Sequence, residues 1–233
     1  MDIVLIPGLW LDASSWDEVV PELAKAGHGA RPLTLPGMES RDSDRSAITL
    51  RDHVASVVEA IDAVRGPVVL VGHSAGCGVA YAAVDARPDH VARAIYVAGF
   101  PTADGDHLAG GFATDGSDLP MPDWSEFDAA DLVDMDDEAR AEMRARAIPS
   151  PAGVLRDRQQ LSDERRYDVP VTAIATEYTS EMLRSWIDQG MAPVREFAKF
   201  RDLEYIDLPT GHWPQFTRPT GLARAILASI DRH

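Results

Sequence analysis

Short apolar runs alternate with longer amphipathic stretches along the whole chain. The runs that predict strands lie at residues 3–6, 31–35, 68–71, 94–98, 169–175 and 203–208. Stretches with helical spacing or helix boundary signals lie at residues 15–26, 49–64, 75–84, 129–147 and 222–230. Strands that alternate with helices are typical of a parallel sheet covered on both faces. The sequence therefore predicts an α/β fold with a mostly parallel central sheet and helices on both of its faces.

Two of the predicted helices carry boundary signals. Ser15 and Glu18 have the spacing of a capping box, and Gly27 would end the helix that they open. Pro21 lies inside this stretch and should weaken it. Thr49 can cap the second helix, whose apolar residues recur at helical spacing: Val54, Val57, Val58, Ile61 and Val64.

Residues 66–76 form the most informative segment of the chain. An apolar strand runs into Gly72-His73-Ser74-Ala75-Gly76, and a helix of small apolar residues follows until Pro88. Gly-x-Ser-x-Gly between a strand and a helix is the pattern of a nucleophile elbow, a turn so sharp that close neighbours must lack side chains. The structural alternative is a serine N-cap between two glycines. The elbow would expose the Ser74 hydroxyl and aim a helix N-terminus at negative charge developing beside it, so Ser74 is the candidate nucleophile.

A serine hydroxyl needs a base to take its proton, and the chain has seven histidines. His212 lies between the last predicted strand and the last helix, where a loop can bring it to the carboxyl edge of the sheet. We expect His73 to serve packing or hydrogen bonding, because neighbours at an elbow point apart, and His53 to face solvent. His233, the C-terminal residue, should be mobile. The candidate base is therefore His212.

An acyl-transfer site also needs donors for the oxyanion of a tetrahedral intermediate. The backbone N–H of Ala75, directly after the candidate nucleophile, should supply one donor. The loop after the first strand, Pro7-Gly8-Leu9, should supply the other, because Gly8 lets the backbone approach and Leu9 then presents its N–H. Taken alone, Pro7-Gly8 would be a simple turn.

The stretch between Gly99 and Pro170 interrupts the alternation and is too long for a plain loop. Residues 101–150 hold 13 Asp and Glu against three Arg, with an expected helix over 129–147. We expect this segment to cap a pocket, because it leaves the carboxyl edge of the sheet, where ligands of open α/β sheets bind. A solvated surface helix would show the same pattern. The residues expected to shape the pocket are Trp10, Met121 and Trp124.

This pattern divides the chain into a core and an insertion. Residues 1–100 and 168–233 should form the α/β core, and residues 101–167, called the insertion below, should form a helical cap or lid. We detect no internal repeat.

Composition narrows the choice of partners. The formal net charge of −16 argues against nucleic acid or an anionic membrane surface. The one cysteine, Cys77, excludes an internal disulfide framework and should be buried and unreactive. The N-terminus has no basic region followed by a long apolar core, and no run approaches the length of a membrane span, so we expect a soluble, cytoplasmic protein.

At this point the chain resembles the α/β-hydrolase superfamily over nearly its whole length, and most of all the small capped branch of plant methylesterases and hydroxynitrile lyases. The matching residues are Pro7-Gly8-Leu9, Gly72-His73-Ser74-Ala75-Gly76, Thr176-Glu177-Tyr178 with Trp186, and Gly211-His212. The resemblance implies esterase activity on small esters, no cofactor, an insertion over the pocket, and the chain order serine, acid, histidine. The branch usually has His-Gly where this chain has Pro7-Gly8, which keeps the glycine of the oxyanion loop.

The acid of the site departs from the branch. The position that usually carries aspartate matches Tyr178 here, and Thr179 follows it. Glu177 is the nearest acid and our choice to orient His212, although strand alternation could turn it away. Asp104, after the neighbouring strand, is the alternative, and Asp207 is a weaker third.

The leading hypothesis is a carboxylesterase-like serine hydrolase acting on a small, neutral, apolar ester, with no cofactor and no metal. A ligand-binding or regulatory protein with a degenerate triad is the alternative, favoured by the missing aspartate. Cyanohydrin cleavage is a further alternative, but lyases of the branch resemble one another in a Thr where Gly8 stands and a Lys where Trp213 stands. A homo-oligomer is compatible with the sequence.

Overall fold

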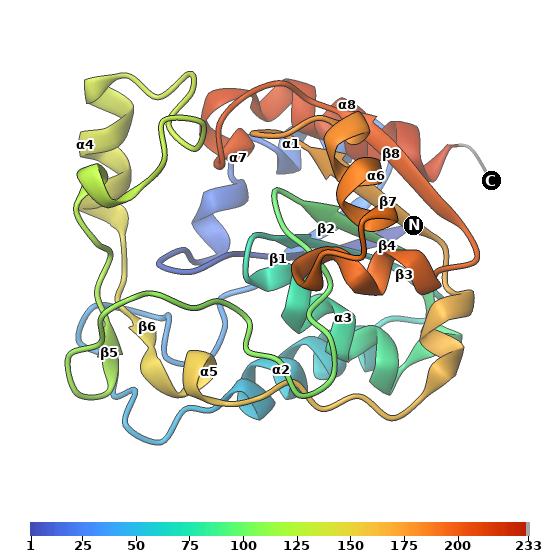
Figure 1. Cartoon of the computed structure of the whole chain (residues 1–233), viewed down its shortest axis with the longest axis horizontal. Coiled ribbons are helices and arrows are strands. Elements are labelled where there is room, and N and C mark those ends of the chain that lie inside the picture. Colours follow the sequence, from blue (N-terminus) through green and yellow to red (C-terminus); the bar gives the residue numbers. More distant parts are fainter. Residues whose placement is uncertain (232–233) are drawn as a thin grey trace.

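Six parallel strands form the central sheet of the computed structural model, which describes residues 1–231 (Figure 1). The strands are β1 (Asp2–Ile6), β2 (Gly29–Pro32), β3 (Val68–His73), β4 (Val91–Val97), β7 (Val171–Ala175) and β8 (Leu203–Asp207). Their order is β2-β1-β3-β4-β7-β8, and every neighbouring pair is parallel. The predicted fold class is confirmed. The expectation for His233 lies outside the described residues.

Helices cover both faces of the sheet (Figure 1). The α-helices are α1 (Val20–Lys25), α2 (Leu50–Asp62), α3 (Gly76–Ala86), α4 (Asp137–Arg146), α5 (Ala152–Arg156), α6 (Ser180–Asp188), α7 (Pro214–Thr217) and α8 (Pro219–Ile230). On one face, Val57 and Ile61 of α2 and Tyr81 of α3 are fully buried. On the other, Leu23 of α1 and Ile226 of α8 are fully buried. This burial follows from strands that are apolar on both sides and need cover on both.

The first predicted helix differs from the expectation. Asp12, and not Ser15, accepts the N–H of Ser14 and opens a short 3₁₀ helix, η1 (Ala13–Trp16). The hydroxyl of Ser15 donates to the Asp12 carbonyl at 2.8 Å, so it is not free to cap. Helix α1 then begins only at Val20, with Pro21 in its first turn, where the missing N–H of proline costs no hydrogen bond. Gly27, with φ of +86°, follows its end as predicted.

The second helix confirms its predicted cap and contains one correction. Thr49 accepts the N–H of Asp52, whose carboxylate in turn accepts the N–H of Thr49. His53 does not face solvent: it is buried, and its Nε2 lies 2.9 Å from the carbonyl oxygen of Pro36. Burial lowers the pKa of His53, with the hydrogen bond to Pro36 opposing that shift. One helical turn of α2 therefore faces the loop after β2 instead of water.

Residues 101–167, the insertion, contribute no strand to the six-stranded sheet. They contain a two-stranded antiparallel sheet of β5 (Asp118–Leu119) and β6 (Ser150–Pro151), a 3₁₀ helix η3 (Trp124–Glu126), and helices α4 and α5. Helix α4 is shorter than the predicted 129–147, because Asp136 caps it by accepting the N–H of Ala139. Figure 1 shows α4 at one end of the molecule, away from the centre of the sheet. The division into core and cap stays a prediction.

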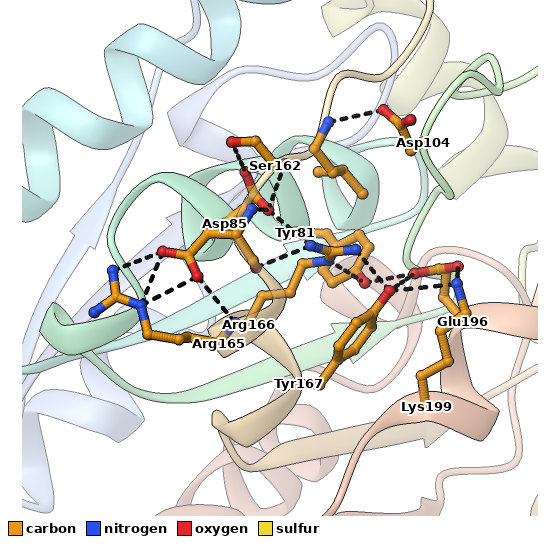
Figure 2. Close-up of polar contacts among 11 residues, drawn as sticks. Tyr81, Asp85, Asp104, Ser162, Arg165, Arg166, Tyr167, Glu196 and Lys199 are labelled. Atoms are coloured by element: carbon orange, nitrogen blue, oxygen red, sulfur yellow. Dashed lines mark hydrogen bonds and ion pairs between the residues drawn. The ribbon is translucent and has the colours of Figure 1, made fainter.

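A buried polar network joins three segments around α3 (Figure 2). Asp85 accepts the N–H groups of Ser162 and Asp163 and the guanidinium of Arg166 at 3.0 Å. Arg166 belongs to the 3₁₀ helix η4 (Glu164–Asp168), and its Nε donates to the Tyr81 hydroxyl at 2.9 Å. The network thus fastens the end of the insertion to the helix that follows Ser74.

Glu196 extends this network to η5 (Ala192–Lys199), a 3₁₀ helix before β8. Its carboxylate accepts the hydroxyl of Tyr81 at 2.6 Å and the ammonium of Lys199 at 2.6 Å. Burial alone would raise the pKa of Glu196, but the hydrogen bonds from Lys199 and Tyr81 outweigh burial and leave the pKa below its ordinary value. The carboxylate is therefore charged and satisfied in a buried position, as buried charges must be. No helix within residues 1–231 is long and apolar enough to cross a bilayer.

Candidate active site

Ser74 stands in the strained turn between β3 and α3. Its φ is +52°, a left-handed conformation that side chains other than glycine rarely adopt. A Cβ at Gly72 would lie 2.7 Å from the carbonyl oxygen of Gly76, and a Cβ at Gly76 would lie 2.5 Å from that of Pro7. Only glycine fits at these two positions, which is the geometry expected of a nucleophile elbow.

Loops after two further strands bring a histidine to Ser74 and a carboxylate to that histidine. His212, after β8, has its Nε2 2.8 Å from the Ser74 Oγ. Glu177, after β7, has its Oε1 3.0 Å from the His212 Nδ1. The structure therefore brings together Ser74, His212 and Glu177 in one chain of hydrogen bonds, in the geometry of a nucleophile, a base and an acid that orients the base.

The surroundings of Glu177 keep it ionised. Burial alone would raise its pKa, but the hydrogen bond to His212, the charge interaction with that ring and the hydroxyl of Thr176 lower the pKa to about 2. A carboxylate that accepts from Nδ1 requires the hydrogen of a neutral His212 ring to sit on Nδ1. That tautomer leaves Nε2 free to accept the proton of Ser74.

The two alternative acids lie elsewhere. Asp104 accepts the backbone N–H of Leu161 at 2.9 Å, and Asp207 accepts the N–H of Ser180 at 2.6 Å and its hydroxyl at 2.8 Å at the start of α6. Both carboxylates thus serve backbone turns and do not contact His212. Tyr178, at the position that matches the usual aspartate, is buried against Phe100 and Trp186.

His73 holds the loop of His212 by a hydrogen bond to its backbone. It is fully buried, and its Nε2 donates to the carbonyl oxygen of His212 at 2.7 Å. Burial, together with the neighbouring His212 ring, lowers the pKa of His73 to about 3, so the ring is neutral at physiological pH. Its expected role in packing or hydrogen bonding is confirmed.

The loop after β1 lies directly against the elbow. A Cβ at Gly8 would lie 3.0 Å from the Cβ of Ser74 and 2.9 Å from the Nδ1 of His73. The next amide, that of Leu9, has no hydrogen-bond acceptor within residues 1–231, and neither has the amide of Ala75. The amide of Trp10, in contrast, donates to the Ser150 Oγ at 2.8 Å, which fixes the loop to the insertion. Two backbone donors beside Ser74 are therefore available for a developing oxyanion.

A cavity of about 270 Å³ opens in front of Ser74, His212 and Glu177. Its other walls come largely from the segment after β4 and from η5: Ala98, Gly99, Phe100, Pro101, Thr102, Ala103, Asp106, His107, Leu108, Ala109 and Pro193. These walls combine apolar side chains with the polar groups of Thr102, Asp106 and His107. The sequence could have indicated the wall residues that directly follow β4, because that strand ends at the carboxyl edge of the sheet. No feature of the sequence indicated Pro193.

The expectation for the pocket aromatics is wrong. Trp10, Met121 and Trp124 do not line this cavity. Instead, Trp10 packs on Phe127 with ring centres 5.9 Å apart, and Trp124 packs on Trp213 at 5.7 Å. Aromatic side chains of the insertion therefore cover the loops next to Leu9 and His212 and leave the cavity to smaller residues.

Within residues 1–231, one group of side chains has possible metal-ligand atoms close enough together to bind an ion. A carboxylate oxygen of Asp131, one of Glu177 and a ring nitrogen of His212 lie within 4.8 Å of one another. Both ring nitrogens of His212 are already engaged, Nδ1 with Glu177 and Nε2 with Ser74. The arrangement thus suits proton transfer to and from Ser74.

A parallel α/β sheet, an elbow serine and a histidine after the last strand define the class of α/β-hydrolase folds. The chain belongs to the alpha/beta hydrolase family, whose sequence model matches residues 3–225.

Similar proteins agree with this assignment. Esterase PIR7B of rice (Oryza sativa subsp. japonica) is 31% identical over 109 residues, which span 45% of this chain and 41% of the length of that relative. A pyrethroid hydrolase of Sphingobium faniae JZ-2 has a similar structure, with a TM-score of 0.71 at 21% identity over 100% of this chain and 98% of that chain. A methylesterase of Arabidopsis superposes with a TM-score of 0.70 at 17% identity over 99% of both chains. The family expected from the motifs is confirmed.

Proposed function

We propose that this protein is a serine hydrolase that cleaves a small carboxylic ester. The observation that carries the proposal is the hydrogen-bonded chain from the Ser74 Oγ through His212 to Glu177. Nucleophilic catalysis by serine needs these three groups within hydrogen-bond reach. The similarity to proteins named as an esterase, a methylesterase and a pyrethroid hydrolase supports the reaction class.

In the first half of the reaction, Ser74 becomes acylated. His212 Nε2 takes the proton of the Ser74 hydroxyl while the Oγ attacks the ester carbonyl carbon. The amides of Leu9 and Ala75 donate to the carbonyl oxygen as it becomes negative. When the C–O bond breaks, His212 gives its proton to the alkoxide, and the alcohol leaves.

In the second half, water regenerates the enzyme. His212 takes a proton from a water molecule that attacks the acyl carbon, and then returns a proton to the Ser74 Oγ as the acid leaves. Glu177 stays charged throughout, because its pKa of about 2 lies far below neutral pH, and stabilises the positive ring that forms twice in the cycle. This sequence of steps uses no cofactor.

The size and charge of the cavity favour a small, uncharged substrate. Its volume of about 270 Å³ is small for a ligand pocket, and its walls carry the carboxyl groups of Glu177 and Asp106, which disfavour an anion. We therefore propose a small, neutral ester as the substrate class. The cytoplasmic location and a homo-oligomeric state stay predictions.

The alternative hypotheses lose support. A degenerate triad was favoured by the missing aspartate, and Glu177 supplies a carboxylate 3.0 Å from the His212 Nδ1. Cyanohydrin cleavage lacks the lysine expected after the histidine, where Trp213 is buried against Phe127.

Replacing Ser74 by alanine tests the proposal. The Ser74→Ala variant should lose hydrolysis of p-nitrophenyl acetate by a factor on the order of 10⁶ in kcat if the triad acts as a unit. Ser185→Ala, a change at an exposed serine on α6, is the matched control and should leave kcat unchanged. A fluorophosphonate should label Ser74 in the wild type. Full activity in Ser74→Ala, or labelling at another residue, would refute the assignment.

A further inference from the structure

Asp131, in the insertion, touches the loop that carries His212. Its carbonyl oxygen accepts the backbone N–H of His212 at 2.8 Å, and the carbonyl of Val133 accepts that of Gly211 at 3.1 Å. A Cβ at Gly211 would collide with both of these carbonyl oxygens. The close approach of the two segments is therefore built into the backbone.

The side chain of Asp131 points to the same place. One of its carboxylate oxygens lies within 4.8 Å of both a carboxylate oxygen of Glu177 and a ring nitrogen of His212. The Oδ2 accepts the backbone N–H of Asp128 at 3.2 Å, which fixes the orientation of the carboxylate. The side chain is half-buried, so its charge is only partly screened by water.

We propose that Asp131 is a second acidic positioning residue of this site, which acts with Glu177 on the imidazole of His212. This inference rests on the proposed function and deepens it. Two carboxylates then face the ring whose positive charge forms at each proton transfer, and the second comes from the insertion. The insertion would thereby help to set the reactivity of the base, in addition to bracing its loop.

The charges around Asp131 give this role a pH dependence. The groups that face it are His212, Glu177 and Asp128. Burial raises the pKa of Asp131 and the charge of Glu177 adds to the rise, while His212 opposes it. The pKa of Glu177 is about 2, so Asp131 loses its charge before Glu177 does as the pH falls. In the wild type, Asp131 is thus charged at neutral pH, and it loses its charge before Glu177 does as the pH falls.

Five variants, including the conservative change Asp131→Glu, test the proposal on p-nitrophenyl acetate hydrolysis. Asp131→Asn, Glu177→Gln and their double variant remove one or both charges and keep an oxygen that can accept the same hydrogen bonds. Asp137→Asn, at an exposed position in the first turn of α4, is the matched control for an equal change of net charge in the insertion. For each variant we would measure kcat, KM and the pH profile of kcat/KM. Thermal unfolding would check that each variant is folded.

The proposal predicts a distinct result for each variant. Asp131→Asn should lower kcat about 5- to 20-fold with little change in KM, and should move the acid limb of the profile to lower pH by roughly 0.5 to 1 unit. Asp131→Glu should recover most of the loss, and Asp137→Asn should match the wild type. Glu177→Gln should keep measurable activity above Ser74→Ala, and the double variant should fall well below either single variant.

Two results would overturn the proposal. The first is an Asp131→Asn profile identical to that of Asp137→Asn, and the second is a Glu177→Gln activity equal to that of the double variant. Failure of the proposed function would look different, because Ser74→Ala would then retain the wild-type rate whatever Asp131 does.

Discussion

Gly8 lies where the loop after β1 packs directly against the elbow of Ser74. A Cβ here would lie 3.0 Å from the Cβ of Ser74 and 2.9 Å from the Nδ1 of His73, closer than real side chains pack. Because close backbone contacts at Gly72 and Gly76 hold the elbow in place, we expect the loop that carries Leu9 to shift instead. Gly8→Ala should therefore move the Leu9 amide and lower kcat for p-nitrophenyl acetate about 10²-fold, with a smaller effect on KM.

Gly110→Ala is the matched control for this change. A Cβ at Gly110 would meet no atom within 4 Å, and its backbone needs no positive φ. It should leave kcat near the wild-type value, measured under the same conditions. A Gly8→Ala enzyme with normal kcat would mean that the Leu9 loop does not hold the oxyanion.

Sequence alone was sufficient to predict the positions of residues that a local pattern marks. The glycines around Ser74 and the position of His212 after the last strand predicted two residues that the structure brings into contact, because elbow and loop are set by neighbours in sequence. Glu177 could be chosen but not decided, since its direction depends on how the chain leaves β7. Asp131 was missed entirely: it reaches His212 only through the packing of the insertion, which no local pattern encodes.

Two adjacent arginines test what holds α3 in place. The guanidinium of Arg166 is buried between Asp85 and Tyr81 (Figure 2), whereas Arg165 pairs with Asp89 and Asp163 on the surface. Removing one partner of a buried pair leaves an uncompensated charge, whereas exposed pairs contribute little. Arg166→Met should lower the free energy of unfolding by about 3 kcal/mol in urea titrations.

Arg165→Met is the control, with the same chemical change one residue away. It should leave the unfolding midpoint almost unchanged. Similar losses of unfolding free energy in the two variants would show that the buried contacts of Arg166 in Figure 2 stabilise the protein no more than the exposed ion pairs of Arg165 do.

At the scale of elements, the sequence predicted strands better than helix starts. Apolar runs marked all six strands, although β2 begins two residues before the expected run and ends at Pro32, directly before the last hydrogen bond to β1, from the N–H of Leu33 to the carbonyl of Leu5. The cap of α2 was found because Thr49 and Asp52 complete each other. The start of α1 was misplaced because Asp12 competes with Ser15, and α4 was overextended because turns over residues 129–134 share its apolar spacing.

The net charge of −16 is a property of the whole molecule with a consequence at the cavity. A negative surface repels anions over the distance set by the Debye length, about 30 Å at 0.01 M salt and about 8 Å at 0.15 M. Arg156 and Arg158 line a second hollow that shares Asp106, His107 and Leu108 with the site cavity. Approach of an anionic ester is therefore governed by two opposed fields, one global and one local.

We expect the global field to dominate. The kcat/KM for 4-acetoxybenzoate, an anion, divided by that for neutral phenyl acetate should rise about 3- to 10-fold between about 0.01 M and 0.15 M salt, because screening removes repulsion only from the charged ester. The ratio cancels salt effects on the chemistry itself. A ratio that falls with salt would mean that Arg156 and Arg158 of the second hollow attract anions more strongly than the rest of the surface repels them. In that case Arg156→Gln with Arg158→Gln should reverse the slope, and the substrate class would have to include acidic esters.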